Sequence, residues 1–400
     1  MKERNTSINM FCTKAATIII IAFTAVTTLL TGCDKIKLTI SESSSEADNN
    51  SEVKIEKVAV VRDPEFASAV VMIKPEDFAD LGFEFGDSVD ISFDNGVCMN
   101  DIPYYNGYYT KIGDPLVCLY PGYKNPVIAY SGGPSLYDTT NLGENSTVSI
   151  SVHEKGKYLE IQDTFSMVYS NEREDYSSDA QCANFRAMKG GNLKNDFLYR
   201  SASPCDNQYG RAPYSCSLME DSEIRHVLDL ADTEEKTASY YEDDAYDISY
   251  WRDVYEKDGI YELAMNASFF SADFKAHVAD AVRYVINEDG PFLIHCTEGK
   301  DRTGFVCFVI GTLADFSLEE LENDYMLTYE NYYNVSKAAD EASYEAVKEV
   351  KFNDFVENIC GVESAKEVTK DQLYDGVVEY LISASLTQEE IDRFKEKITN

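Results

Sequence analysis

The sequence has little positive charge and few of the residues that usually hold metal ions. Its 35 Lys and Arg residues are outnumbered by 71 Asp and Glu residues, which gives a formal net charge of -36. A surface this acidic repels nucleic-acid backbones, and no basic stripe offsets it, so we expect no nucleic-acid partner. Only 4 histidines are present, and the chain contains no H-E-x-x-H or C-x-x-C motif. We therefore expect no metal site and no cofactor.

The cysteines leave the disulfide pairing open. The chain has 10 of them. Cys205 and Cys216 are close enough in sequence to close a short loop, and Cys98 and Cys118 form a second candidate pair. Buried free thiols are the alternative for each pair.

Long apolar runs are scarce, and the most prominent one lies near the N-terminus. It covers residues 15–30 and follows a positively charged start. Its last residue begins the sequence Leu-Thr-Gly-Cys, with the cysteine at position 33. The run is short for a helix of ~20 residues that spans a bilayer. This segment resembles the signal peptide of bacterial lipoproteins. The resemblance implies removal of residues 1–32, lipidation of Cys33 and an extracytoplasmic location on the bacterial membrane; an uncleaved membrane anchor is the alternative.

Two segments follow this start. Residues 33–55 are rich in Ser, Glu and Asn and poor in apolar groups, which predicts a disordered tether. Residues 56–165 contain short alternating runs such as 89–93 and 148–152, and residues 158–161 follow a turn at 154–157, which predicts a hairpin. We expect a small all-β domain here, either a barrel or a sandwich. The tyrosine pairs at 104–105 and 108–109 fit half-buried strand aromatics better than a binding surface.

The pattern changes to mixed α/β from about residue 180. Residues 224–230 and 292–294 read as buried strands, and residues 303–314 are apolar almost all round, which predicts a central helix. Three Ser/Thr-x-x-Glu/Gln sequences predict capping boxes that open later helices; they begin at Ser317, Thr369 and Thr387. We expect an α/β domain over residues 180–400, in which helices flank a central sheet and form the C-terminal part.

One loop combines the features of a phosphate-binding catalytic site. The strand ending at Ile294 runs into His-Cys-Thr-Glu-Gly-Lys-Asp-Arg-Thr-Gly over residues 295–304, and the central helix follows. Amide N–H groups in such a loop and the helix N-terminus favour a bound phosphate and the thiolate form of Cys296. Arg302 can hold two phosphate oxygens, and Gly299 permits the tight turn. We expect Cys296 to attack phosphorus and Thr303 to donate a hydrogen bond to its sulfur.

This loop resembles the signature of the cysteine-dependent protein tyrosine phosphatase superfamily, and its Lys-Asp-Arg-Thr-Gly end resembles the bacterial secreted and lipoprotein branch. The elements Asn-Phe-Arg at 184–186, Gly-Gly at 190–191, Tyr-Arg-Ser at 199–201 and Asp-Leu at 229–230 agree with that branch. The resemblance implies a phosphatase that acts on phosphotyrosine proteins or on phosphoinositides. The branch often has an arginine after Asp-Leu, where this chain has Ala231, so the chain departs from the pattern of the branch on that side of the pocket.

The remaining site residues follow from the same resemblance and from their positions. The usual general acid of the branch is the aspartate before the arginine, here Asp301, with Asp232 and Asp229 as alternatives. Thr297, Glu298, Gly299 and Lys300 are expected to contact substrate, Lys300 through a second phosphate or a lipid headgroup. Arg200 either lines the site or pairs with an acid. His295 is expected to orient the loop. A phosphate-binding or scaffold lipoprotein without catalysis is the rival interpretation.

Overall fold

The computed structural model describes residues 54–64 and 66–400. The expected signal peptide, Cys33 and nearly all of the expected tether lie outside these residues. Within the described part of the chain, no helix combines the length and apolar character needed to cross a bilayer.

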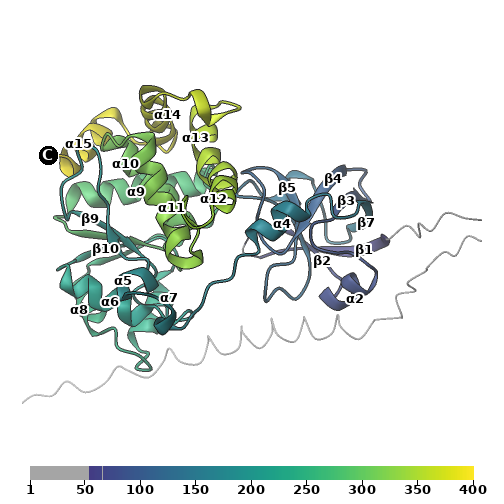
Figure 1. Cartoon of the computed structure of the whole chain (residues 1–400), viewed down its shortest axis with the longest axis horizontal. Helices are drawn as coiled ribbons and strands as arrows, with labels where there is room; N and C mark the ends of the chain where they lie inside the picture. The colour runs from purple at the N-terminus through teal and green to yellow at the C-terminus, as the bar shows by residue number, and fades with distance from the viewer. Residues whose placement is uncertain (1–53, 65) are drawn as a thin grey trace, which may run out of the picture. The chain divides into compact units, whose positions relative to one another are not determined.

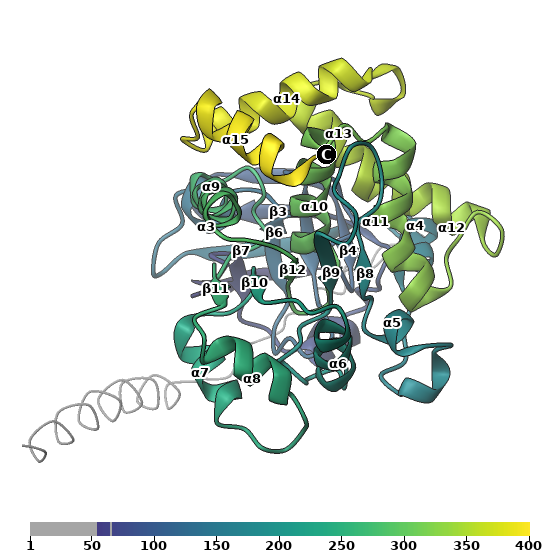
Figure 2. The same cartoon turned by 90° about the vertical axis from the view of Figure 1, so that its left-hand side faces the viewer.

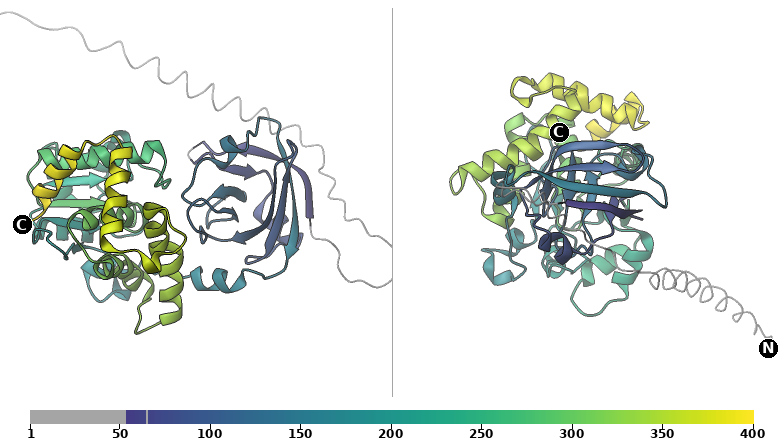
Figure 3. Two further views of the ribbon diagram at one scale, coloured as in Figure 1. Left: turned by 90° about the horizontal axis from the view of Figure 1, so that it is seen from above. Right: turned by 90° about the vertical axis from the view of Figure 1, so that its right-hand side faces the viewer.

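The N-terminal part of the described chain is a closed seven-stranded barrel (Figures 1 and 3). Its strands close in the order β1-β2-β6-β5-β4-β3-β7, and all neighbours are antiparallel except β4 and β5. Of the two expected architectures, barrel and sandwich, the barrel is the one observed. The part is not all-β, however, because three short helices accompany the sheet. The elements are β1 (Lys54–Arg62), β2 (Ala69–Val71), α2 (Pro75–Asp80), β3 (Ser88–Phe93), β4 (Cys98–Tyr105), β5 (Pro115–Cys118), β6 (Val127–Tyr130), α3 (Leu136–Thr139), β7 (Thr147–Glu154) and α4 (Leu159–Phe165).

Alternation of side chains builds the barrel core. Val89, Ile91 and Phe93 of β3 all point inward and are buried, while the residues between them face away. The predicted hairpin after β7 is wrong. Tyr158 is the N-cap of the helix α4 and residues 159–161 form its first turn, and β7 pairs with β1 and β3 instead. Phe165, at the end of this helix, is buried. The apolar pattern of residues 159–165 is too short to distinguish a helix from a strand in the sequence.

A five-stranded sheet forms the centre of the C-terminal part. Its order is β11-β10-β12-β9-β8, and all pairs are parallel except β8 with β9 at the edge. Figure 2 shows the sheet between α6–α8 and the group α9, α10, α14 and α15. The strands are β8 (Arg186–Ala187), β9 (Leu198–Ser201), β10 (His226–Asp229), β11 (Ile260–Glu262) and β12 (Phe292–His295).

Neighbouring residues of the central strands pack into different cores. Val227 and Leu293 belong to the cluster with Trp251, whereas Leu228 and Ile294 belong to the cluster of α9 and α10. This explains the continuous apolar runs, because a parallel sheet covered on both faces has no polar side. The helices are α5 (Asp179–Cys182), α6 (Ala212–Asp221), α7 (Glu234–Tyr241), α8 (Ser249–Tyr255), α9 (Ala272–Asn287), α10 (Asp301–Leu313), α11 (Leu318–Tyr333), α12 (Glu341–Val347), the π-helical turn η2 (Lys348–Phe352), α13 (Asn353–Cys360), α14 (Lys370–Ser383) and α15 (Gln388–Ile398).

The helix after the signature loop, α10, is buried on every side. All of its residues from Thr303 to Leu313 are buried, as the apolar run predicted. All three predicted capping boxes are present and open α11, α14 and α15. The eight described cysteines are free thiols, so neither candidate disulfide forms in this structure.

Candidate active site

The signature loop connects the end of β12 to the start of α10. Cys296 directly follows the strand and is 3% exposed. Gly299 has a φ of 67°, and an added Cβ would lie 2.1 Å from the carbonyl oxygen of Ser201. Only glycine fits this turn, because both the positive φ and the close approach of the backbone exclude a side chain.

Two buried side chains hold this loop from behind. The carbonyl oxygen of Gly299 accepts hydrogen bonds from Arg200 Nη2 at 2.8 Å and from Asn184 Nδ2 at 3.1 Å. Arg200 is 0% exposed, and its Nη1 donates to Asp324 Oδ2 at 2.6 Å. The side chain of Arg200 therefore lies outside the cavity described below. Of its two expected roles, the geometry matches pairing with an acid rather than contact with substrate.

The amides of the loop are free to bind an anion. No hydrogen bond joins the backbone N–H groups of residues 297–302 to any other described residue. These groups lie at the N-terminus of α10, where unpaired amides and the helix dipole add partial positive charge. Such a cradle binds a phosphate without a dedicated cation.

Arg302 and Thr303 lie on the first turn of α10. Arg302 Nη1 donates to the carbonyl oxygen of Met265 at 2.9 Å, and Nη2 donates to Thr297 Oγ1 at 3.2 Å. The hydroxyl of Thr303 is buried and makes no hydrogen bond with the described residues, so the expected bond to the sulfur of Cys296 is absent in this structure. It remains an unused donor.

The three candidate acids occupy different surroundings. Asp301 is about half exposed and lines the cavity above the loop. Asp229 and Asp232 are buried and do not line it, and they lie behind the wall to which Ala231 contributes. Burial raises the pKa of Asp229 to about 6, a shift that the nearby Asp232 adds to and His295 opposes. Position therefore favours Asp301 as the group that can reach a substrate.

Glu298 and Lys300 form the polar rim of the loop. Lys300 Nζ lies 3.6 Å from a Glu298 carboxylate oxygen and 3.8 Å from one of Asp301. Burial alone would lower the pKa of Lys300, but Glu298 and Asp301 outweigh it and raise that pKa. The second oxygen of Glu298 accepts a hydrogen bond from Tyr169 Oη at 2.5 Å. Both side chains are thus held at the cavity.

A cavity of about 1100 Å³ opens above Cys296. Thr297, Glu298, Lys300, Asp301 and Arg302 line its floor, and Tyr325, Tyr329 and Tyr333 of α11 line one side. The outer wall comes from the barrel part, whose aromatic contributions are Phe66, Tyr108, Tyr109, Tyr120, Tyr123, Tyr130 and Phe165. Tyr104 and Tyr105 are strand aromatics of β4 as expected, but they are fully rather than half buried. Tyr108 and Tyr109 lie in the loop after β4 and line this cavity, so for them the expectation of strand aromatics is wrong.

Four polar contacts fix the barrel loop between β4 and β5 against the helical tail. Lys111 Nζ pairs with Glu357 at 2.8 Å and with Glu349 at 3.2 Å. The N–H of Ile112 donates to Asp354 Oδ2 at 2.6 Å. Lys351, on the π-helical turn η2, donates to the carbonyl oxygen of Tyr108 at 2.5 Å. The aromatic wall is thus attached to the catalytic part at several points.

The sequence interpretation missed the barrel wall, Tyr169, Asp324 and the tail residues that attach the loop. In the sequence, only the Asn-Phe-Arg and Tyr-Arg-Ser elements indicated part of this set, because their arginines are the partners of Asp324. Arg186 and Arg200 both pair with Asp324, at 3.1 and 2.6 Å, and Asn184 bonds to the loop itself.

The comparisons with known proteins agree with this geometry. A model described as the tyrosine phosphatase family matches residues 180–400. The chain belongs to the tyrosine phosphatase family. A curated tyrosine-protein phosphatase from Nostoc commune is 25% identical over 122 residues, which are 29% of this chain and 42% of that protein. The match to this family member thus spans less than half of the curated protein's length.

Two solved structures are similar to part of the chain. The core catalytic domain of the PP-IP phosphatase SIW14 from S. cerevisiae, in complex with citrate, is 20% identical with a TM-score of 0.24 and covers 44% of this chain and 91% of that one. A second structure of the Siw14 catalytic core is 19% identical with the same TM-score and covers 44% and 90%.

Proposed function

We propose that this protein hydrolyses phosphate monoesters through a cysteinyl-phosphate intermediate on Cys296. The observation that carries the proposal is the thiol of Cys296 at the base of a loop whose amides at 297–302 are unpaired and whose next turn bears Arg302. The bacterial secreted or lipoprotein branch of the family, suggested by Lys-Asp-Arg-Thr-Gly, belongs to the same proposal.

The reaction takes two displacements. The thiolate of Cys296 attacks phosphorus and forms the S–P bond, while the bond from phosphorus to the leaving oxygen breaks and Asp301 gives that oxygen a proton. Water then attacks the phosphocysteine, Asp301 takes a proton from it, and phosphate and the thiolate are released. The amides and Arg302 stabilise the charge on the phosphoryl oxygens, so the mechanism needs no cofactor. Thr303 donates its unused hydroxyl to the departing sulfur.

Phosphotyrosine in a protein is the favoured substrate. The cavity is much larger than one phosphate, and its walls carry aromatic rings from α11 and the barrel that suit a phenyl ring and the residues beside it. Asp301 would protonate the phenolate. Thr297, Glu298 and Lys300 would contact the substrate at the floor.

A phosphoinositide is the second candidate. Lys300 and Lys351 both line the cavity and would bind a second phosphate on the ring. Burial lowers the pKa of Lys351, and a bound phosphate would favour its charged form.

A substrate panel tests the proposal and separates the two classes. Three proteins are assayed with phosphotyrosine peptides, phosphoinositides and inositol phosphates: the wild type, Cys296→Ser and Cys307→Ala. The last is the control, because it removes a different buried thiol, which lies on α10. We expect turnover by wild type and control, inhibition by vanadate, and none by Cys296→Ser. Tight phosphate binding without turnover by wild type would instead support the phosphate-binding or scaffold alternative.

The cellular location is a further part of the proposal. The lipobox-like end at Cys33 supports a lipoprotein held on the outer side of a bacterial cell membrane by its acyl chains. Cys33→Ser should release the protein into the soluble fraction. Unchanged membrane retention of that variant would contradict lipidation at this cysteine.

A further inference from the structure

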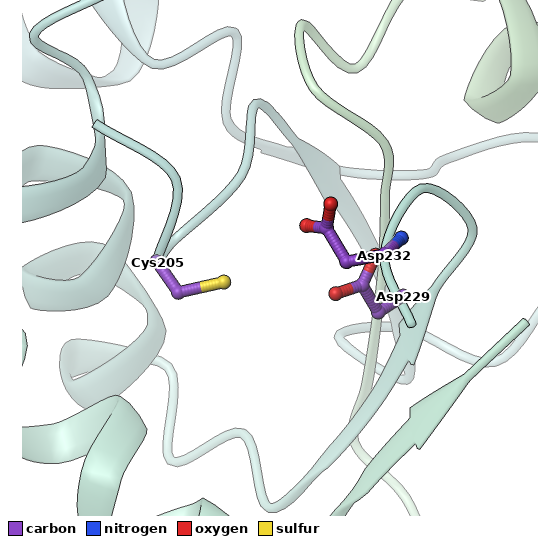
Figure 4. A group of neighbouring side chains, drawn as sticks. All are labelled: Cys205, Asp229 and Asp232. Carbon is purple, nitrogen blue, oxygen red and sulfur yellow. The ribbon is translucent and has the colours of Figure 1, made fainter. Parts of the chain in front are cut away.

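Three potential metal ligands meet behind the wall of the cavity. They are Cys205 after β9, Asp229 at the end of β10 and Asp232 before α7, and one ligand atom from each lies within 4.8 Å of the other two. Figure 4 shows the sulfur of Cys205 directed across the gap toward the two carboxylates. All three residues are buried.

The outer carboxylate oxygens have no hydrogen-bond donors. Oδ1 of Asp229 accepts from the N–H groups of Ala231 and Asp232, at 2.9 and 3.1 Å, and Oδ1 of Asp232 accepts from Lys236 Nζ at 2.6 Å. Oδ2 of both aspartates is buried and makes no hydrogen bond with the described residues.

A neighbouring histidine gives a second, independent indication of a missing partner. His295 is 0% exposed, and its Nε2 makes no hydrogen bond with the described residues. This nitrogen lies 3.8 Å from Asp229 Oδ2. Buried polar atoms normally have partners, so a cluster of such orphans points to a ligand.

The charges of the cluster favour a cation. Two carboxylates and a thiol are enclosed there. Lys236 is the one lysine that pairs with them in the described part of the chain; its Nζ lies 2.6 Å from Asp232 Oδ1 and 3.9 Å from Asp206 Oδ2, which is outside the cluster. Buried charges are normally paired or bound to metal. A sulfur ligand disfavours magnesium and calcium, and zinc accepts sulfur, nitrogen and carboxylate ligands together.

We propose that Cys205, Asp229 and Asp232 bind a divalent zinc-like metal ion. Binding replaces the thiol proton by the metal, and that proton passes to solvent. Lys236, Ala231 and Thr233 line the cavity, so the ion can enter past the half-exposed Lys236 side chain. The ion would join the segment after β9 to the turn after β10, beside His295 and therefore next to Cys296. This role does not depend on the proposed phosphatase activity.

Cobalt and zinc binding to the full-length protein test the site. The purified protein is treated with a chelator and dialysed against cobalt or zinc, and bound metal is measured by mass spectrometry and by the thiolate-to-cobalt absorption. We expect one ion per chain, and we expect Cys205→Ala and Asp232→Asn to lose it together with this absorption. Zinc should also raise the melting temperature of wild type but not of Cys205→Ala.

Two further variants exclude other thiols. Cys296→Ser removes the active-site thiol, and Cys216→Ala removes another buried thiol on α6; both should keep the ion and the absorption. If Asp232→Asn does not fold, Cys205→Ala and Cys296→Ser still test the site, because the thiolate-to-cobalt absorption must be lost in the first and kept in the second. Absence of bound metal in wild type, or its loss in Cys296→Ser, would overturn the proposal, and two aspartates sharing a proton would then explain the cluster.

Discussion

Gly299 shows how one residue sets the shape of the loop. Its φ is positive, and an added Cβ would lie 2.1 Å from the Ser201 carbonyl oxygen, so the turn has no room for a side chain. Gly299→Ala should therefore displace the loop and lower kcat/KM on a small aryl phosphate about 10²-fold, the typical cost of a misplaced catalytic group.

Gly96→Ala is the matched control for this prediction. Gly96 has a φ of 90°, but an added Cβ meets no atom within 4 Å. This variant should lose about 1–2 kcal/mol of stability in urea unfolding and keep its activity. Equal activity of both variants would show that the tight approach at Gly299 has no catalytic consequence.

Asp301 can be tested as the proton donor through the leaving group. Asp301→Asn should lower kcat about 10²-fold or more on a phenolic phosphate and less on an ester with a better leaving group. The limb of the pH profile that reports loss of the acid should also disappear. Asp273→Asn, which alters another cavity-lining carboxyl, is the control. An unchanged kcat and pH profile would mean that another group, not Asp301, donates the proton.

At the scale of elements, Asp324 of α11 ties two strands to the loop. It pairs with Arg186 of β8 and Arg200 of β9. Burial alone would raise the pKa of Asp324, but these two arginines lower it. Asp324→Asn leaves the fully buried guanidinium of Arg200 and the partly buried one of Arg186 without a carboxylate. We therefore expect a loss of about 3–5 kcal/mol in urea unfolding at neutral pH.

Asp280→Asn provides the comparison for that loss. Asp280 is half exposed and pairs with Arg283 at 3.4 Å, so this variant should cost less than about 1 kcal/mol. Similar losses in the two variants would mean that the buried pairs contribute no more than a surface pair.

The α9–α15 contact predicts a stability that depends on pH. Glu390 accepts a hydrogen bond from Arg283 Nε at 2.8 Å, which lowers the pKa of Glu390 from 4.5 to about 2. Glu390→Gln keeps a capping-box residue type but loses the charge. Because the folded pKa is the lower one, the wild type should be more stable than the variant above about pH 4.5, and the difference should vanish as pH falls through about 2. Urea unfolding at several pH values measures it, and a constant difference would contradict the prediction.

Local sequence was informative where structure is local. The capping box at Ser317 depends on residues three apart, and the loop at 296–302 depends on one strand and one helix, so both were predictable. The role of Arg200 stayed open because its partner, Asp324, is distant in sequence. The helix α4 was misread because a short apolar run fits a strand equally well, and the barrel wall requires contacts that no local pattern encodes.

At the scale of the whole molecule, the barrel should influence which substrates bind. Tyr120 lines the cavity and is 42% exposed. Tyr120→Ala should lower kcat/KM for phosphotyrosine peptides roughly 2- to 10-fold, the range of one aromatic contact, and leave a small aryl phosphate nearly unaffected.

Met72→Ala is the matched barrel control. Met72 is 43% exposed and does not line the cavity, so Met72→Ala should leave kcat/KM unchanged for both substrates. If Tyr120→Ala lowered kcat/KM equally for the peptide and the small aryl phosphate, the barrel wall would act on the catalytic loop rather than on substrate choice.

The shared walls of the cavity have a practical consequence for assays. The family match begins at residue 180, yet part of the lining lies between residues 66 and 134. A recombinant fragment cut to the family boundary would carry Cys296 and Arg302 but present a wider mouth. Its turnover of small reagents would overstate how permissive the intact protein is, and inhibitors selected on it would be fitted to a surface that the intact protein covers.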